Sequence, residues 1–285
     1  MNYKRRIFVS LIFFAIFFFA VSVIGNFEAV TTFEEDTPFD LPILMYHSVN
    51  PDKTRTGKYV ITPENFESDL EYLENCGYTS ISAKQLIKYV YNKEPLPDKP
   101  VLLTFDDGMY NNFKYVVPIL KKHNAHAIFS VVGAYTDEYS ENNITNDNYS
   151  YMRWCDIGSL VDSENVEFGN HSYNFHSISA LRHGSRKNKY EATLDYIKIF
   201  DEDMQQMQTQ FYSNCSFRLI IYTYPYGAYS KESERVLQKN GFIITLSCIE
   251  GMNKISHNKN CLYLMKRFNR HGNMTSDEFF TRKKL

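Results

Sequence analysis

Short apolar runs alternate with amphipathic stretches along most of this chain. The runs are rich in β-branched and aromatic residues, which predicts buried strands at 42–49, 79–82, 101–105, 127–132, 166–169, 219–224, 242–248 and 263–268. Apolar residues three and four apart predict helices at 63–75, 83–92, 110–123, 152–161, 188–211, 230–240 and 276–280. The polar, Asn-rich stretch 133–149 predicts a long loop beside a groove. Strands alternating with helices indicate a parallel α/β fold, and a domain of this size favours a closed or nearly closed barrel.

The N-terminus has a separate pattern. Lys4, Arg5 and Arg6 precede an apolar stretch at 7–24 that only two serines interrupt. Such a stretch can span a bilayer with its basic flank in the cytoplasm, and a cleaved signal peptide is the alternative. Because no clear cleavage site follows, we favour an uncleaved anchor. We therefore expect an anchor or signal peptide at 1–25, a linker at 26–40 and one folded domain at 41–285, outside the cytoplasm.

Composition argues against a nucleic-acid partner, a disulfide-rich fold and a thiolate metal site. A formal net charge of −2 and the lack of a polybasic tract argue against a nucleic-acid partner. The five cysteines are widely spaced and form no CxxC pair, so they specify neither a disulfide framework nor a thiolate metal site. We expect them to be small buried hydrophobic residues.

Two acidic residues and two histidines follow predicted strands. Asp106 and Asp107 come directly after the strand 101–105, and His171 and His176 follow the strand 166–169. An acidic pair before a glycine is also typical of a polar turn, and a lone histidine is more often structural. On a helix the two histidines would diverge by about 140°, but in a turn they can converge. Two imidazoles and a carboxylate are a common ligand set for a catalytic divalent transition metal.

The segments LMYHSV, LLTFDDG, GNHSYNFHS and YPYGAYS occur in this order between about residues 40 and 270. Together they resemble the motifs of the polysaccharide deacetylase family, carbohydrate esterase family 4. The resemblance implies a distorted (β/α) barrel with Asp106 as general base. It also implies that Asp107, His171 and His176 hold a divalent metal ion, which we expect to be zinc, with cobalt, nickel or manganese as alternatives.

The chain departs from the family motifs in three places. The two histidines have one extra residue between them. The arginine that pairs with the base in the family would fall at Thr223, and we expect Arg153 or Arg267 to replace it. The late histidine that acts as general acid has no clean match. His271 is the first candidate, and His47, after the first strand of the domain, is another.

Further residues are expected to contact substrate. These are His47, the Tyr226–Gly227 turn, where a backbone N–H would stabilise the oxyanion, and Trp154 as a groove wall. The implied function is metal-dependent removal of N-acetyl groups from an extracytoplasmic N-acetylglucosamine polymer, such as peptidoglycan, poly-N-acetylglucosamine or a chitin-like chain. Two alternatives stay open: a glycan-binding homologue without turnover, and an esterase that removes O-acetyl groups.

Overall fold

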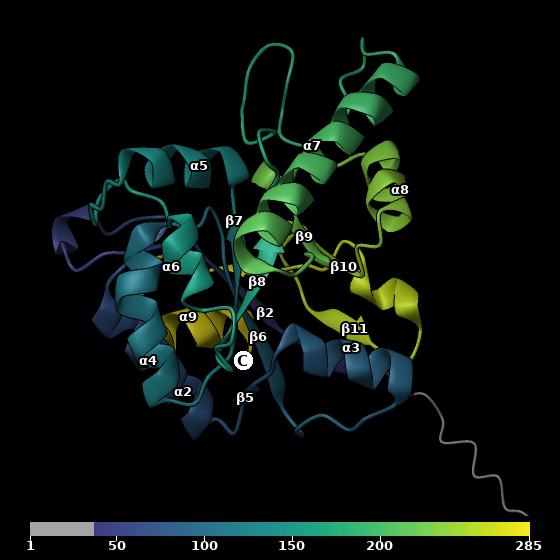
Figure 1. Cartoon of the computed structure of the whole chain (residues 1–285). Coiled ribbons are helices and arrows are strands. Elements are labelled where there is room, and N and C mark those ends of the chain that lie inside the picture. The colour runs from purple at the N-terminus through teal and green to yellow at the C-terminus, as the bar shows by residue number, and fades with distance from the viewer. Residues whose placement is uncertain (1–36) are drawn as a thin grey trace, which may run out of the picture. The chain divides into compact units, whose positions relative to one another are not determined.

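A curled parallel sheet of eight strands is the centre of the structure, a computed structural model that describes residues 37–285 (Figure 1). Its strands are β2 (Ile43–Tyr46), β5 (Thr79–Ser80), β6 (Pro100–Phe105), β7 (Ala127–Val131), β8 (Val166–Asn170), β9 (Ile221–Thr223), β10 (Ile244–Leu246) and β12 (Phe268–Asn269). They lie in the order β10-β9-β8-β7-β6-β2-β12, and β5 pairs with β6. Outside the sheet, β1 (Phe39–Leu41) pairs with β11 (Asn253–Ile255), and β3 (Ser48–Val49) pairs with β4 (Val60–Ile61).

A short segment near the C-terminus connects the two edges of this sheet. Met265 forms a parallel bridge with Leu246 of β10, and four residues later Asn269 of β12 pairs with Met45 of β2. We call residues 265–269 the closing segment. Because this segment contains the edge strand β12 and also bridges to β10, the strand at the other edge, the sheet curls into a distorted barrel. This confirms the fold class predicted from the alternating strands and helices.

Helices follow most strands and lie around the sheet (Figure 1). They are α2 (Pro63–Asn75), α3 (Ala83–Asn92), α4 (Val117–Lys122), α5 (Gly133–Asn142), α6 (Trp154–Gly158), α7 (Thr193–Cys215), α8 (Lys231–Lys239) and α9 (Ser276–Lys283). Helices α2 and α3 begin where the sequence indicates. The Thr62 and Ser82 side chains cap them by accepting hydrogen bonds from the backbone amides of Asn65 and Gln85, respectively.

Several stretches differ from the sequence-based prediction. The predicted strand at 263–268 is mostly irregular and reaches strand β12 only at Phe268. The predicted loop at 133–149 begins with helix α5. Its sequence shows no apolar stripe at helical spacing, because its described buried residues are only Gly133 and Thr136. Asn143, with a φ of 49°, ends that helix. Helix α7 begins at Thr193 rather than 188, so a longer irregular connection, 171–192, runs from β8 to α7.

The predicted anchor or signal peptide at 1–25 lies outside the described residues. Among residues 37–285, no helix is long and apolar enough to span a membrane. The five cysteines all lie within this range, and only Cys215 is buried as expected: Cys76, Cys248 and Cys261 are half-buried and Cys155 is exposed.

Candidate active site

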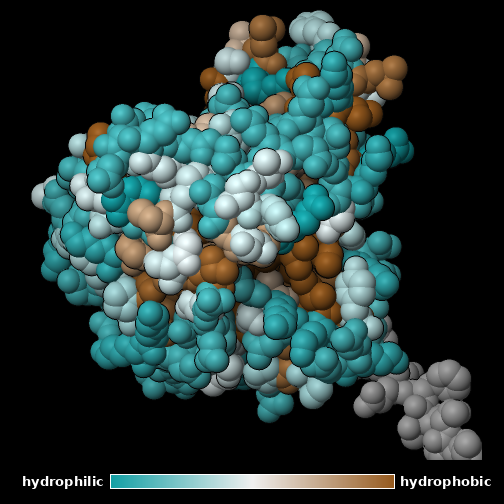
Figure 2. Space-filling model, in the orientation of Figure 1, coloured by the Kyte–Doolittle hydropathy of each residue, from teal (hydrophilic) through white to brown (hydrophobic). Residues whose placement is uncertain are grey.

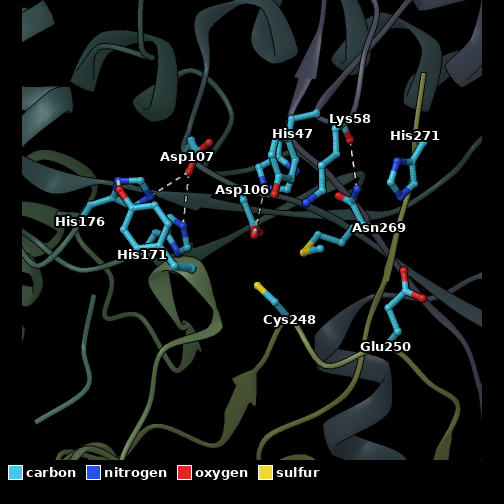
Figure 3. A pocket seen from close by; sticks show the side chains of 13 residues that line it. His47, Lys58, Asp106, Asp107, His171, His176, Cys248, Glu250, Asn269 and His271 are labelled. Atoms are coloured by element: carbon cyan, nitrogen blue, oxygen red, sulfur yellow. Dashed lines mark hydrogen bonds and ion pairs between the residues drawn. The ribbon is translucent and has the colours of Figure 1, made fainter. Parts of the chain in front are cut away.

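A cavity of about 520 Å³ opens at the carboxyl ends of the barrel strands. Side chains that the sequence places after four different strands line it, namely His47, Asp106, Asp107, His171, His176 and Tyr226, together with His271 after β12. Their convergence follows from the parallel sheet, since the carboxyl ends of parallel strands meet at one edge. Figure 3 shows these side chains around the cavity.

Asp107, His171 and His176 form a compact cluster on one side of this cavity. Asp107 Oδ1 lies 3.3 Å from His171 Nε2 and 3.1 Å from His176 Nε2 (Figure 3). The other ring nitrogens are engaged elsewhere: His171 Nδ1 donates to the Thr223 carbonyl at 2.8 Å, and His176 Nδ1 lies 3.2 Å from the Tyr226 hydroxyl. Both imidazoles are thus oriented with Nε2 toward the carboxylate, an arrangement that fits a divalent metal ion.

The charges of this cluster reinforce one another. Burial alone would raise the pKa of the Asp107 carboxyl, but hydrogen bonds from both histidines hold that pKa well below its ordinary value. Burial alone would lower the pKa of His171, but the contact with Asp107 and the nearby Asp106 charge raise it. The Asp107 carboxylate therefore stays ionised and favours a positive charge beside it, which a bound cation would supply.

Local backbone geometry directs these ligands into the cavity. Asp107 and Gly108 adopt φ values of 70° and 74°, so the chain turns sharply after β6. A Cβ atom on Gly108 would lie 2.8 Å from Cγ1 of Val131, and the turn therefore needs glycine.

Asp203 of α7 fixes the turn between the two histidines. Its carboxylate accepts hydrogen bonds from the amides of Tyr173 at 2.8 Å and Asn174 at 2.7 Å. Burial raises the pKa of Asp203 to about 6. These contacts accommodate the extra residue between His171 and His176. Asp203 is not among the residues predicted from the sequence, although an acidic residue on the apolar face of an amphipathic helix is a signal that points to it.

Asp106, next to the metal-site-like cluster, is paired with Arg267. Nη1 and Nη2 of Arg267 lie 2.7 and 2.8 Å from the two carboxylate oxygens, and both side chains are buried. Burial raises the pKa of Asp106, but the guanidinium outweighs it and lowers that pKa below its ordinary value. Arg267 of the closing segment thus occupies the role of the arginine missing at Thr223. Arg153, the other candidate, pairs with Asp156 instead.

Two histidines flank the aspartates at different distances. His47 Nε2 lies 4.0 Å from Asp106 Oδ2, and its ring packs against Tyr59. Burial lowers the pKa of His47, and its Nδ1 has no hydrogen-bond partner among the described residues. His271 lines the same cavity on its far side, beyond Asn269 (Figure 3), and partial burial lowers its pKa.

The turn after β9 brings one of its two predicted residues into the cavity. Tyr226, with a φ of 58°, lines the cavity and packs its ring over His176. The Gly227 N–H donates to the Tyr224 carbonyl at 2.8 Å, so it is used within the turn itself. A Cβ on Gly227 would lie 2.7 Å from Cβ of Cys248. Gly227 therefore shapes the turn, and its own N–H is not available to an oxyanion.

Trp154 does not line this cavity, contrary to its predicted position on the groove wall. Its ring packs against Phe211 of α7, and its indole N–H donates to Asp137 at 2.6 Å. The short helix α6 packs against α7, so the indole stabilises that contact.

Comparisons with known proteins agree with this site. Residues 93–244 match the family model described as polysaccharide deacetylase. YxkH of Bacillus subtilis (strain 168), provisionally named a polysaccharide deacetylase, is 25% identical over 73% of this chain and 64% of its own length. The poly-beta-1,6-N-acetyl-D-glucosamine N-deacetylase of Escherichia coli (strain K12) is 22% identical over 73% of this chain, which spans 34% of that protein.

The fold also matches a solved structure. The Streptococcus pyogenes deacetylase PplD, in complex with acetate, superposes with a TM-score of 0.68 at 21% identity, covering 87% of this chain and all of that one. The similarity supports the barrel assignment, while the family model matches more than half of the sequence. The chain therefore belongs to the polysaccharide deacetylase family.

Proposed function

We propose that this protein is a metal-dependent hydrolase that removes N-acetyl groups from an N-acetylglucosamine-containing polysaccharide outside the cytoplasm. One observation carries the proposal: the cavity places a two-histidine, one-carboxylate cluster beside a second, ion-paired carboxylate. An Asp/His/His cluster suits a metal, and an adjacent ionised carboxylate suits a general base. The deacetylase named for the E. coli relative supports the same substrate class.

Asp107, His171 and His176 would hold the metal, for which we propose zinc, with cobalt, nickel or manganese as alternatives. When bound, such an ion lowers the pKa of a water molecule and polarises the acetyl carbonyl. Asp106 accepts the proton that the attacking water loses, and Arg267 keeps the carboxylate ionised and in position for that transfer. Tyr226 contributes its ring to the cavity wall and its N–H to the developing oxyanion.

The leaving amine needs a proton from a nearby acid. His271 and His47 are both candidates from the sequence, and the geometry favours His47 because its Nε2 lies 4.0 Å from Asp106. We expect His47→Gln to lower kcat by about 10²-fold or more, as loss of a general acid does, and His271→Gln to change it much less. A larger loss in His271→Gln, with His47→Gln near wild type, would return the role to His271.

The cellular location is also part of the proposal. The basic flank at 4–6 and the apolar stretch at 7–24 favour an anchor that leaves the catalytic domain outside the cytoplasm. Protease treatment of intact cells would then degrade residues 41–285 without lysis. Protection of the domain until the cells are lysed would contradict this location.

The direct test measures acetate and free amine released by the full chain, loaded with Zn²⁺ or Co²⁺. N-acetylglucosamine oligomers, poly-β-1,6-N-acetylglucosamine and peptidoglycan are the substrates, with Asp106→Asn and His171→Ala as inactive controls. Metal-dependent release that both variants lose would establish the activity. Glycan binding without release would favour the binding homologue, and release only from O-acetylated glycans would favour the esterase.

A further inference from the structure

A second cavity, of about 530 Å³, lies beside the segment 177–192, the second part of the connection from β8 to α7. Four basic side chains line it, together with His183, several polar residues and one carboxylate; the basic residues are Arg182, Arg186, Lys187 and Lys189. We propose that this cavity is a subsite for an anionic group, a phosphate or a carboxylate, carried by the glycan next to the sugar that is deacetylated. This inference rests on the proposed function and adds a substrate class to it.

The charge of this cavity is largely uncompensated. Arg182 is paired with Glu191, with Nη2 and Oε1 2.7 Å apart. Arg186 instead donates to the His183 ring. Within residues 37–285, no carboxylate is at ion-pair distance from Arg186, Lys187 or Lys189, and the cavity lining itself contributes Glu232 alone as an acid. Since the whole chain has a formal net charge of −2, this positive cavity is a local feature that attracts anions.

A row of rings connects this cavity to the metal-site-like cluster. The His176 and Tyr226 ring centroids are 4.7 Å apart, and those of Tyr226 and His183 are 6.0 Å apart. Arg186 Nη2 then lies 3.0 Å from His183 Nδ1. Tyr226 and His183 therefore form the boundary between the two cavities. A glycan with its acetamide at the cluster can extend across Tyr226 and present its next group to Arg186.

The segment that carries these basic residues is fixed against the active site. Gly184 has a φ of 51°, and a Cβ atom there would lie 2.4 Å from the Pro225 carbonyl oxygen, so the segment packs directly on the turn that carries Tyr226. The hydroxyls of Ser185 and Tyr222 are 2.5 Å apart, and both residues are buried. The backbone that carries the subsite is thus held in place, which lowers the part of the entropic cost of binding that comes from ordering the segment.

Substrates that differ only in charge test the subsite. We would measure KM, kcat and equilibrium binding of the full metal-loaded chain on three N-acetylglucosamine oligomers: a neutral one, a phosphorylated one, and one containing N-acetylmuramic acid as the carboxylate. The variants are Arg186→Gln and Lys189→Gln. Arg235→Gln is the matched control, because it removes one exposed cation from α8 outside the cavity.

We expect Arg186→Gln to raise KM and Kd for a charged oligomer by about tenfold, with the neutral oligomer and the control variant unchanged. The charged oligomer that responds identifies the group as phosphate or carboxylate. Equal effects on neutral and charged oligomers, or no effect, would overturn the subsite. Failure of wild type to deacetylate any oligomer would refute the proposed function instead, and the binding constants would still test the subsite.

A lipid surface is the competing partner for these basic residues. Leu181 and Tyr190 of the same segment are 75% and 83% exposed, and Figure 2 shows apolar patches within a mostly hydrophilic surface at this end of the molecule. Sedimentation with phosphatidylglycerol vesicles is therefore part of the test. Vesicle binding that Arg186→Gln abolishes, with no effect on oligomers, would overturn the subsite and assign the residues to membrane contact.

Discussion

Replacing Arg267 with methionine is the sharpest test of the role proposed for Asp106 as a general base. Methionine keeps much of the side chain's length but removes every donor from Asp106, which is 2% exposed. It also removes the hydrogen bonds from Arg267 to the Ser247 carbonyl and the Thr104 hydroxyl. Asp106 would then be a buried carboxylate without its guanidinium, with only the rings of His171 and His47 left to favour its charge.

The expected loss of stability is about 3–5 kcal/mol near neutral pH, as for other buried ion pairs that lose one partner. Its pH dependence follows from the pKa of Asp106. In the wild type that pKa is lowered, so the ionised carboxylate stabilises the fold above the ordinary value of 3.8. In the variant, burial without the guanidinium raises the pKa of Asp106. The ionised carboxylate then destabilises the fold as the pH rises through this raised pKa. The difference between the proteins should therefore shrink as the pH is lowered.

Activity should change in a way that stability alone does not explain. Asp106 must be ionised to accept a proton, so Arg267→Met should lower kcat/KM by about 10²-fold and move the acidic limb of its pH profile to higher pH. Urea unfolding gives the stability, and acetate release between pH 5 and 9, at a temperature where the variant is folded, gives the profile.

Arg270→Met is the matched control. Arg270 is equally buried and forms a similar pair with Asp69, which does not line the active-site cavity. We expect a comparable loss of stability with the acidic limb unmoved. If Arg267→Met kept the wild-type pH profile, or if Arg270→Met shifted it as far, the role assigned to Arg267 would be wrong.

Three further predictions concern the metal cluster and its supports. The pKa of His171 is raised above its ordinary value of 6.5, so protons should already compete with the metal above pH 6.5. The affinity for Co²⁺, followed by absorption spectroscopy, should therefore fall as the pH is lowered. An affinity that does not change between pH 8 and pH 6 would contradict this. Asp203→Asn should weaken metal binding by about tenfold, because an amide replaces the carboxylate that accepts hydrogen bonds from two backbone amides. The control is Asp195→Asn, at an exposed position on the same helix. Equal metal affinity in the two variants would refute the role of Asp203 in positioning the histidines. Gly108→Ala should cost about 1–3 kcal/mol in urea unfolding because of its φ and its contact with Val131, and an unchanged midpoint would show that the turn tolerates a side chain.

The main part of the site could be predicted because it depends on a general property of parallel sheets. Asp106, Asp107, His171 and His176 each follow a strand whose pattern is visible, and parallel strands bring such positions to one edge. The same property does not show whether Arg267 or Arg153 pairs with Asp106. The position of Arg267 depends on the closing segment, where the sequence predicts a strand at 263–268 but the structure forms only the two-residue strand β12 after that arginine.

Other errors also have local physical causes. Helix α5 has a weakly apolar face, so its sequence is hard to distinguish from a polar loop. Trp154 was placed by residue type alone, and the packing of its ring against Phe211 depends on a contact between two helices that are distant in sequence. His47 and His271 both follow strands, and the sequence does not show which of them has a ring nitrogen 4.0 Å from Asp106, as His47 has in the structure.

The closing segment has a consequence for the order in which the protein is made. Arg267 is separated from Asp106 by 161 residues and lies close to the end of the chain. A chain still emerging during synthesis can form the strands up to β10 before the arginine exists, so Asp106 must remain either hydrated or protonated until nearly the whole sequence is available. We therefore expect prematurely terminated chains that end before Arg267 to lack activity even when they retain every proposed metal ligand.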